Sequence, residues 1–435
     1  MTQTFNARFH HLRPMAVVAC ATPGEVAAVL ERARRDGVEV VARSGGHCFA
    51  GHSSTEGIVV DVSPMAAVEL DGELVTVGAG TRLGPLYDAL QAHGLAIPGG
   101  TCPTVGIAGL ALGGGLGVLG RTYGVTSDRL VAAEIVLPDG QALRCDDTRH
   151  PDLFWALRGA GAGNFGVVTS FTFRTVPAPV GTNLHLSWPI EAAAQVIDAW
   201  QTWAPIAPDE LHASLKLTAG DDPARPPSVD VYAFLQDDRG AAETLVSQTQ
   251  PRPRRVQVVP STWPETRVFW AQLPTVDGGE PGPEDEAQYF VSKSEYFRRR
   301  LPGGAIDALL DHFARDRRPG EARELDFMPW GGAFTRVPAD ATAFVHRDEL
   351  FQLKHVASLD PVAPQAAKDA AHAFTTESWS VVHRWGSGRV FPNFPDPDLD
   401  PETAAEAYYG ENHARLLEIK ARYDPDRLFH APQAL

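Results

Sequence analysis

Apolar and polar positions in the first third of the chain follow two different periods. Short apolar runs predict strands at residues 15–20, 38–43, 57–62, 74–77, 132–138 and 166–176. Apolar residues that recur every three or four positions predict helices at residues 23–36, 82–91 and 108–119. Strands and helices are therefore mixed along this region, which indicates an α+β fold.

The pattern changes near Pro177, where proline, arginine and acidic residues become more frequent. Strand-like segments at 213–217, 229–235, 343–345 and 350–356 are separated by helical ones, which favours an antiparallel sheet covered by helices. The acidic, turn-rich segment 278–287 predicts an exposed loop. A final helix is predicted over 402–422, after a stretch rich in proline and aspartate.

Length and charge limit the classes of function. A chain of 435 residues is long enough for two domains with separate cores. Its formal charge of −16 argues against nucleic acid as a partner, because phosphate binding requires clustered lysine and arginine. No apolar run is long enough to span a membrane, and the N-terminus lacks the apolar core of a signal peptide. We therefore expect a cytoplasmic protein without a membrane partner.

The four cysteines, Cys20, Cys48, Cys102 and Cys145, show neither CxxC pairing nor the spacing of a zinc site. We expect neither a disulfide framework nor a bound metal. Three of them can be small core residues. Cys102 differs, because it lies within a glycine-rich motif.

The first motif follows a predicted strand and reads Arg43-Ser44-Gly45-Gly46-His47. Two glycines at the end of a strand allow backbone N–H groups to approach an anion closely, as a phosphate site requires. Gly51 and Ser53 extend the same loop. The alternative is a tight turn in which the histidine has no special role.

The second motif, residues 98–128, reads PGGTCPTVGIAGLALGGGLGVLGRTYGVTSD. Glycines alternating with small apolar residues suit close packing against a planar cofactor or a pyrophosphate. The motif lacks the GKS/T of a Walker loop, and it has no strand–GxGxxG–helix unit. Glycine content alone is weak evidence for a cofactor.

Together, four ordered motifs resemble those of the berberine bridge enzyme-like oxidases, within the vanillyl-alcohol-oxidase type of flavoproteins. They are RSGGH, CPTVGIAGLALGGGLG with RTYG, LFWALRGAGAGNFGVVTSF and YYGENHARLLEIKARYDP. The resemblance covers residues 15–176 and 391–433 well and the middle loosely. It implies an FAD-binding domain of the PCMH type, formed by residues 1–178 and a C-terminal segment 386–435, with a substrate-binding domain over 179–385.

The resemblance also implies how FAD is held. His47 matches the histidine that bonds the 8α-methyl group of the flavin, and Cys102 matches the cysteine that bonds C6 in doubly linked members. The alternative for Cys102 is a packed free thiol. Val105 matches a position where valine is associated with access of O2 to the flavin, which favours O2 as electron acceptor.

The remaining cofactor positions follow residue by residue from the same resemblance. The pyrophosphate is expected at Arg43, Ser44, Gly45 and Gly46, helped by Gly51, His52 and Ser53. The dinucleotide is expected against Thr104, Val105, Gly106, Gly109, Leu110, Gly113, Gly114 and Gly117, with Asp128 nearby. The adenine side is expected at Gly166, Val167 and Val168, and Tyr409 and Asn412 are expected to close over the flavin.

The sequence departs from the family pattern where alcohol-oxidising members carry tyrosine bases. Leu116, Phe391 and Phe49 stand at those positions, so none can act as an ionisable phenol. Gln352 and Lys354, which alternation places on one face of their strand, are candidates for contacting the substrate, the alternative being a solvated face. Tyr123 is a further candidate catalytic residue, with packing as its alternative.

Three functions are compatible with these observations. The first is an oxidase that transfers hydride from a small, apolar, secondary-metabolite-like molecule to covalent FAD, with O2 as acceptor. The second is oxygenation or oxidative cyclisation or rearrangement of a polyketide-like substrate. The third is a non-redox cyclase or a binder that retains flavin. Neither the substrate nor the oligomeric state follows from the sequence.

Overall fold

The computed structural model describes residues 4–236, 239–276 and 288–435. The described chain divides into two compact units. The first unit comprises residues up to Ala178 together with Val337–His346 and Phe391–Leu435, and the second comprises Pro179–Arg336 and Arg347–Val390. The predicted loop 278–287 lies outside the described residues. None of the helices in the described part of the chain is long and apolar enough to cross a membrane.

Residues 337–346 pack with the first unit, although the expected domain limits place them in the middle of the substrate domain. Asn412 Nδ2 donates to the carbonyl oxygens of Ala339 and Thr342 at 2.8 and 3.2 Å. Trp155 Nε1 donates to the carbonyl oxygen of Asp340 at 2.8 Å. These contacts hold the segment against α5 (Pro151–Ala160) and the C-terminal helices.

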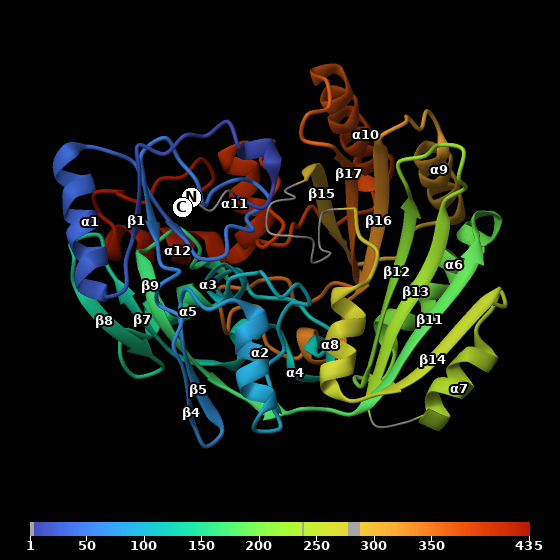
Figure 1. The fold of residues 1–435 in the computed structure, drawn as a ribbon, viewed down its shortest axis with the longest axis horizontal. Helices are drawn as coiled ribbons and strands as arrows, with labels where there is room; N and C mark the ends of the chain where they lie inside the picture. The colour runs from blue at the N-terminus through green and yellow to red at the C-terminus, as the bar shows by residue number, and fades with distance from the viewer. Residues whose placement is uncertain (1–3, 237–238, 277–287) are drawn as a thin grey trace. The chain divides into compact units, whose positions relative to one another are not determined.

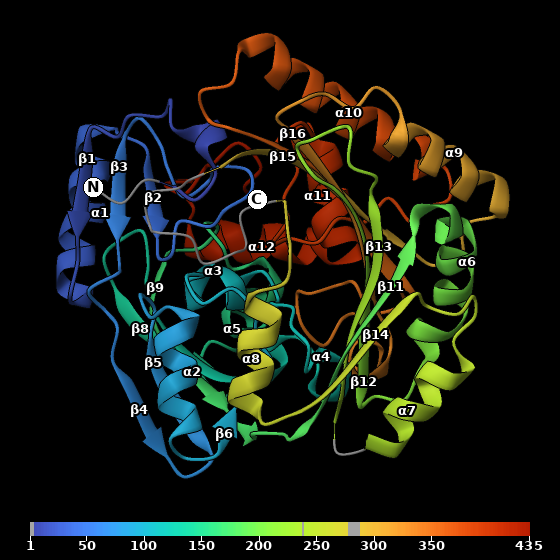
Figure 2. The same ribbon diagram turned by 45° about the vertical axis from the view of Figure 1, so that its right-hand side comes forward.

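The first unit contains a parallel sheet with the strand order β1-β3-β2 (Figures 1 and 2; the second labels all three strands). Its strands are β1 (Ala16–Ala19), β2 (Val40–Arg43) and β3 (Ile58–Asp61), and α1 (Pro23–Asp36) connects the first two. Thr22 and Glu25 form a capping box at the start of α1, and Gly37 ends the helix with φ 64°. The helix is thus bounded by residues that satisfy its terminal N–H and C=O groups.

A second, antiparallel sheet of this unit has the order β4-β5-β9-β7-β8, and β6 pairs with β10. The strands are β4 (Val68–Asp71), β5 (Leu74–Gly78), β6 (Leu95–Ala96), β7 (Leu130–Val136), β8 (Ala142–Asp146), β9 (Val167–Arg174) and β10 (Val176–Pro177). The helices are η1 (Ala7–Phe9), α2 (Leu83–Gln91), α3 (Ile107–Leu112), α4 (Gly120–Tyr123), η2 (Thr126–Arg129), α5 (Pro151–Ala160), α11 (Pro401–Tyr409), η6 (Gly410–Asn412) and α12 (His413–Tyr423).

Two predicted helices of this unit are shorter than expected because glycines interrupt them. The helix predicted over 108–119 ends at Leu112, and Gly114 and Gly115 follow with φ of 111° and 84°. The helix predicted over 402–422 is broken at Gly410, whose φ is 47°. The chain turns at both points, and both turns lie in the motifs expected to contact the cofactor.

The second unit is built on one large antiparallel sheet, with the order β14-β11-β13-β12-β16-β17-β15. Its strands are β11 (Gly181–Pro189), β12 (Leu211–Ala219), β13 (Ser228–Gln236), β14 (Arg255–Ser261), β15 (Tyr289–Phe297), β16 (Glu321–Pro329) and β17 (Phe351–Leu359). The helices are η3 (Ile190–Ala192), α6 (Ala193–Trp203), η4 (Ala204–Ile206), α7 (Arg239–Gln248), α8 (Trp263–Ala271), α9 (Gly303–Ala314), η5 (Gly332–Thr335) and α10 (Gln365–His383). The strand predicted at 343–345 is wrong, because these residues form an irregular segment of the first unit.

Helices α6, α9 and α10 lie on one side of this sheet (Figures 1 and 2). Alternate residues of the strands point to that side and form the hydrophobic core, including Leu215, Phe327 and Leu353. The predicted alternation in β17 is confirmed, since Phe351 and Leu353 belong to this core whereas Gln352 and Lys354 do not. The opposite face, here called the polar face, carries Gln352, Lys354, Lys216 and Asp326, together with the aromatic residues Tyr232 and Phe234.

Candidate functional site

The loop after β2 is fixed by its own polar side chains. Arg43 is 5% exposed, and its Nε donates to the carbonyl oxygen of Ser53 at 2.8 Å. Ser44 Oγ donates to the carbonyl oxygen of Ala79 at 2.7 Å. The sequence predicts that Arg43 and Ser44 bind the pyrophosphate. In the structure, Arg43 Nε and Ser44 Oγ stabilise the loop itself.

Gly45 and Gly106 bring the two predicted cofactor motifs into backbone contact. A Cβ on Gly45 would lie 2.3 Å from the Gly106 nitrogen, and a Cβ on Gly106 would lie 2.2 Å from Ser44 Oγ. Both distances are far below van der Waals contact, so only glycine fits at either position. The first motif and the second motif are therefore held together at this point.

His47 and Cys102 meet at one side chain, that of Thr104. Thr104 Oγ1 lies 3.0 Å from His47 Nε2 and 3.2 Å from Cys102 Sγ. The ring of Phe5 stacks on the His47 imidazole with centroids 4.2 Å apart, and Phe5 N donates to the Gly46 carbonyl at 3.0 Å. Phe5 was not singled out in the sequence, because a single aromatic residue near the N-terminus carries no local signal.

Gly51, His52 and Ser53 continue the first loop. Gly51 has φ 74°, and Phe9 lies so close that an added Cβ would be 2.5 Å from its ring. Burial lowers the pKa of His52 to about 4, so its imidazole is neutral near pH 7. Ser53 Oγ is buried and has no hydrogen-bond partner among the described residues. A buried hydroxyl without a partner is costly, and a ligand oxygen would satisfy it.

The glycine-rich helix α3 is held by Asn393. Asn393 Oδ1 accepts from Gly115 N at 3.0 Å, and Nδ2 donates to the Gly109 carbonyl at 2.8 Å. A Cβ on Gly113 would lie 2.4 Å from this amide, whereas nothing lies within 4 Å of the position a Cβ would take on Gly109. The Gly109 side of α3 is therefore open to a ligand, and the Gly113 side is closed by Asn393.

Other residues of the second motif serve its packing. The Val105 carbonyl accepts from Leu83 N at 2.9 Å, and Gly106 is the N-cap of α3. Asp128 Oδ2 accepts from Val125 N at 3.0 Å and so holds η2. Gly117 packs directly on the Gly99 carbonyl, and Leu110 covers Gly100. Tyr123 ends α4 and is half-buried.

Aromatic rings surround Phe391 and Phe49, two of the positions where the family pattern predicts a tyrosine base. Phe344 contacts Phe391 edge to face at 6.0 Å, Phe391 contacts Phe394 at 5.2 Å, and Phe394 contacts Phe49 at 4.9 Å. The ring of Phe344 also lies 2.7 Å from where a Cβ on Gly114 would stand. This cluster of four phenylalanines offers hydrocarbon surface and no ionisable group.

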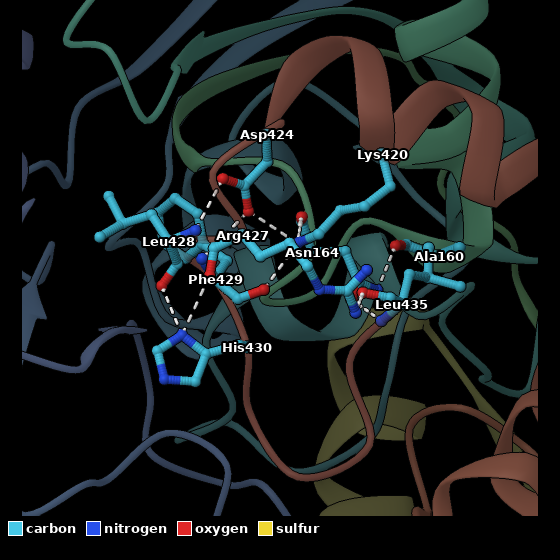
Figure 3. Close-up of polar contacts among 9 residues, drawn as sticks. All are labelled: Ala160, Asn164, Lys420, Asp424, Arg427, Leu428, Phe429, His430 and Leu435. Atoms are coloured by element: carbon cyan, nitrogen blue, oxygen red, sulfur yellow. Dashed lines mark hydrogen bonds and ion pairs between the residues drawn. The ribbon is translucent and has the colours of Figure 1, made fainter.

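The C-terminal helices are tied to the segment before β9 (Figure 3). Lys420 Nζ is buried and donates to Asp424 Oδ2 at 2.8 Å and to the carbonyl oxygens of Asn164 and Phe429. Asn164 Nδ2 in turn donates to the Tyr409 hydroxyl at 3.2 Å. Burial raises the pKa of Tyr409, so it stays a neutral phenol. Asn164 was not predicted, since its role depends on contacts with residues far away in the sequence.

The residues predicted on the adenine side lie at the start of β9. Val167 and Val168 are buried and pair with Val136 and Ile135 of β7. A Cβ on Gly166 would lie 2.4 Å from the Val136 carbonyl oxygen. Asn412 is also buried, and its amide holds the segment 339–343.

In the second unit, Gln352 and Lys354 lie on the polar face of the sheet. Lys354 Nζ lies 3.8 Å from Asp326 Oδ2, and Lys216 Nζ lies 3.6 Å from the same oxygen. Glu324 Oε2 adds a second acidic group 3.4 Å from Lys216 Nζ. The register places Lys216, Asp326 and Lys354 directly opposite one another on neighbouring strands. This charged row, Lys216–Asp326–Lys354 with Glu324, was not predicted beyond Lys354.

Gln352 is fully buried, and neither atom of its amide has a hydrogen-bond partner among the described residues. Leaving a buried amide unsatisfied costs about 1–3 kcal/mol. A polar ligand group at this position would remove that cost. The alternative interpretation, in which Gln352 lies on a solvated face, does not fit its burial.

Comparison with known proteins identifies the cofactor. Residues 14–146 match the FAD binding domain model, and residues 390–435 match the model of berberine and berberine-like proteins. The uncharacterised FAD-linked oxidoreductase YvdP of Bacillus subtilis (strain 168) is 33% identical over 433 residues, covering 97% of this chain and 92% of the relative. Xylooligosaccharide oxidase of Thermothelomyces thermophilus is 32% identical over 460 residues, covering 99% and 88%.

The solved structure of wild-type Physcomitrella patens BBE-like 1 has a TM-score of 0.86 at 28% identity, covering 99% of this chain and 93% of that one. The predicted α+β fold with a PCMH-type FAD-binding domain is thereby confirmed. The glycine contacts of the two motifs, the open side of α3 and the unsatisfied Ser53 hydroxyl fit a dinucleotide cofactor. The chain is therefore an FAD-dependent enzyme and belongs to the berberine bridge enzyme-like family of FAD-linked oxidoreductases.

Proposed function

We propose that the protein is an oxidase that holds FAD covalently through His47 and Cys102 and oxidises a small organic molecule, with O2 as electron acceptor. The observation that carries this proposal is the meeting of the two side chains at Thr104, with contacts of 3.0 and 3.2 Å. Imidazole and thiol are the nucleophilic groups that such bonds require. Val105, in the same loop, supports O2 as the acceptor through its place in the family motif.

FAD would lie against the residues that line the two motifs. The open side of α3 at Gly109, the Ser53 hydroxyl and the neutral His52 imidazole offer space and hydrogen bonds to a dinucleotide. We assign the other predicted cofactor positions, including Asp128, Val168, Tyr409 and Asn412, to the support of these loops and of the cofactor. Bound FAD supplies a two-electron acceptor for a hydride.

The substrate would meet the polar face of the second unit. The Gln352 amide and the charged row offer both hydrogen-bond donors and hydrogen-bond acceptors. Gln352 and Lys354 would orient the substrate, and Tyr123 stays a candidate for contact near the cofactor motifs.

The cluster of four phenylalanines that includes Phe391 provides no base, so the substrate class must release its hydride without deprotonation by a tyrosine. Electron-rich amines and phenols of the secondary-metabolite type meet this condition.

Oligosaccharides are a second candidate class, because relatives at 30% and 32% identity are named chitooligosaccharide oxidase and xylooligosaccharide oxidase. Because positions 49, 116 and 391 hold no tyrosine, sugar oxidation would require a base elsewhere in the site. A panel of aromatic amines, phenols and oligosaccharides, with peroxide measured per substrate consumed, separates the two classes. Incorporation of labelled O2 into the product would instead indicate oxygenation. If the substrate is converted in the absence of O2 while the flavin colour stays unchanged, the function is not a redox reaction.

Covalent attachment is tested by acid precipitation, visible spectroscopy and intact mass. We expect a yellow pellet from the wild type and from Cys102→Ala, with an altered spectrum in the variant. Cys48→Ala is the matched control. Cys48 is next to His47 in the sequence, burial raises the pKa of its thiol, and the proposal assigns it no bond to the flavin. A colourless wild-type pellet would refute covalent attachment.

A further inference from the structure

Thr104 places one hydroxyl group between the two side chains that the proposed function assigns to covalent attachment. Its Oγ1 contacts His47 Nε2 and Cys102 Sγ at once. A hydroxyl both donates and accepts hydrogen bonds, so it can take a proton from one neighbour while giving its own to the other. We propose that Thr104 relays the proton of Cys102 to His47 when the Cys102–flavin bond forms. This inference rests on the proposed function.

Each attachment removes one hydrogen from FAD and one from the protein. At His47 a C–N bond replaces a C–H bond of the 8α-methyl group and an N–H bond of the imidazole. At Cys102 a C–S bond replaces the C6–H bond and the S–H bond. In both reactions O2 takes two electrons and two protons and becomes hydrogen peroxide, so atoms and electrons balance. Both protein protons come from atoms that Thr104 contacts.

The direction of the relay follows from which ring nitrogen Thr104 holds. Nε2 is engaged with Thr104, so the carbon bond forms at Nδ1, which requires the Nε2–H tautomer beforehand. In that tautomer Nε2 donates to Thr104. Once the bond exists and the Nε2 proton has left to water, Nε2 carries a lone pair and accepts from Thr104. Thr104 can then take the Cys102 proton, which leaves the thiolate that is the reactive form of cysteine.

The surrounding backbone holds the three side chains at these distances. The loop of Thr104 is pinned by hydrogen bonds from Gly84 N to the Pro103 carbonyl and from Ile107 N to the Thr81 carbonyl, both 2.9 Å. The stacked Phe5 ring fixes the plane of the imidazole. Threonine is β-branched, so its hydroxyl has few alternative directions.

The test compares Thr104→Val, which removes the hydroxyl and nearly keeps the shape, with Thr104→Ser, which keeps the hydroxyl. Freshly purified full-length protein is incubated with FAD and air, denatured at intervals and treated with iodoacetamide. Peptide mass spectrometry then gives the fraction of Cys102 that is still a free thiol. We expect Thr104→Val to slow the loss of this thiol by about 10²-fold, the usual effect of general acid–base assistance, and Thr104→Ser to behave as wild type.

Two further measurements separate a relay from a structural role. Raising the pH should restore the Thr104→Val rate, since hydroxide then deprotonates the thiol directly. His47→Ala should slow Cys102 attachment as well, and Thr104→Val should add nothing to it, because both changes remove the same proton path.

A Thr104→Val rate equal to that of the wild type, in a protein with wild-type melting temperature, would overturn the relay and leave covalent attachment intact. Cys102 that stays fully alkylated in the wild type would overturn its bond to flavin, and the relay with it. The two failures are therefore distinguishable.

Discussion

Lys420 and Asp424 form an ion pair that is almost completely removed from water. The two atoms, Nζ and Oδ2, are 2.8 Å apart, and the side chains are 2% and 0% exposed. Burial lowers the pKa of Lys420, and its pairing with Asp424 opposes that shift. The pair joins α12 to the segments around Asn164 and Phe429, and so fixes the C-terminal part of the FAD-binding unit.

Replacing Lys420 by methionine should destabilise the protein strongly. The Asp424 carboxylate would remain buried without its counter-charge, which typically costs about 3–5 kcal/mol. Urea unfolding of the holoenzyme measures the effect. Arg422→Met is the matched control: it breaks an exposed pair with Asp152 and should cost about 0–1 kcal/mol. Equal losses in the two variants would contradict the importance of burial.

Glu349 should make stability depend on pH. Burial raises its pKa to about 7, although Arg298, 3.2 Å from Oε1, opposes the shift. Between the ordinary value of 4.5 and about 7 the folded state holds a proton that the unfolded state has lost, so stability falls as pH rises through this window. In wild type the free energy of unfolding should fall by up to about 3 kcal/mol across this pH window because of Glu349, and Glu349→Gln should abolish that fall. Unfolding free energies at pH 5, 6, 7 and 8 test it, and an unchanged slope would refute it.

Gly45→Ala should reduce the FAD content of the purified protein. Its Cβ would lie 2.3 Å from the Gly106 nitrogen, so the two motifs would be forced apart. Such overpacking typically costs about 1–3 kcal/mol. The ratio of flavin to protein absorbance is the measurement. Gly304→Ala, at the start of α9 with nothing within 4 Å, serves as the control and should retain full FAD.

Lys354→Met should impair substrate use without loss of flavin. It removes a donor from the polar face where Gln352 lies, and we expect kcat/KM to fall by about 10- to 100-fold for the best substrate of the panel. Lys293→Met is the control, since Lys293 lies on the opposite face over the Trp379 ring. Similar losses for both lysines would contradict a special role of Lys354 in substrate binding.

The local pattern of the sequence determined much of this protein. Periodicity predicted α1, and alternation predicted that Gln352 and Lys354 share a face. The glycine, histidine and cysteine motifs carried enough signal to predict the family and FAD, because those residue types serve a backbone geometry or a bond that few other residues can supply.

Only the tertiary structure decided how distant residues combine. Thr104 between His47 and Cys102, Asn393 across α3, and the charged row joining three strands all depend on contacts between segments far apart in sequence. The same reason explains why the buried Gln352 amide finds no hydrogen-bond partner in the described part of the chain and why residues 337–346 belong to the first unit. Local periodicity depends on neighbouring residues, whereas these contacts arise when the chain packs, so no short stretch of sequence encodes them.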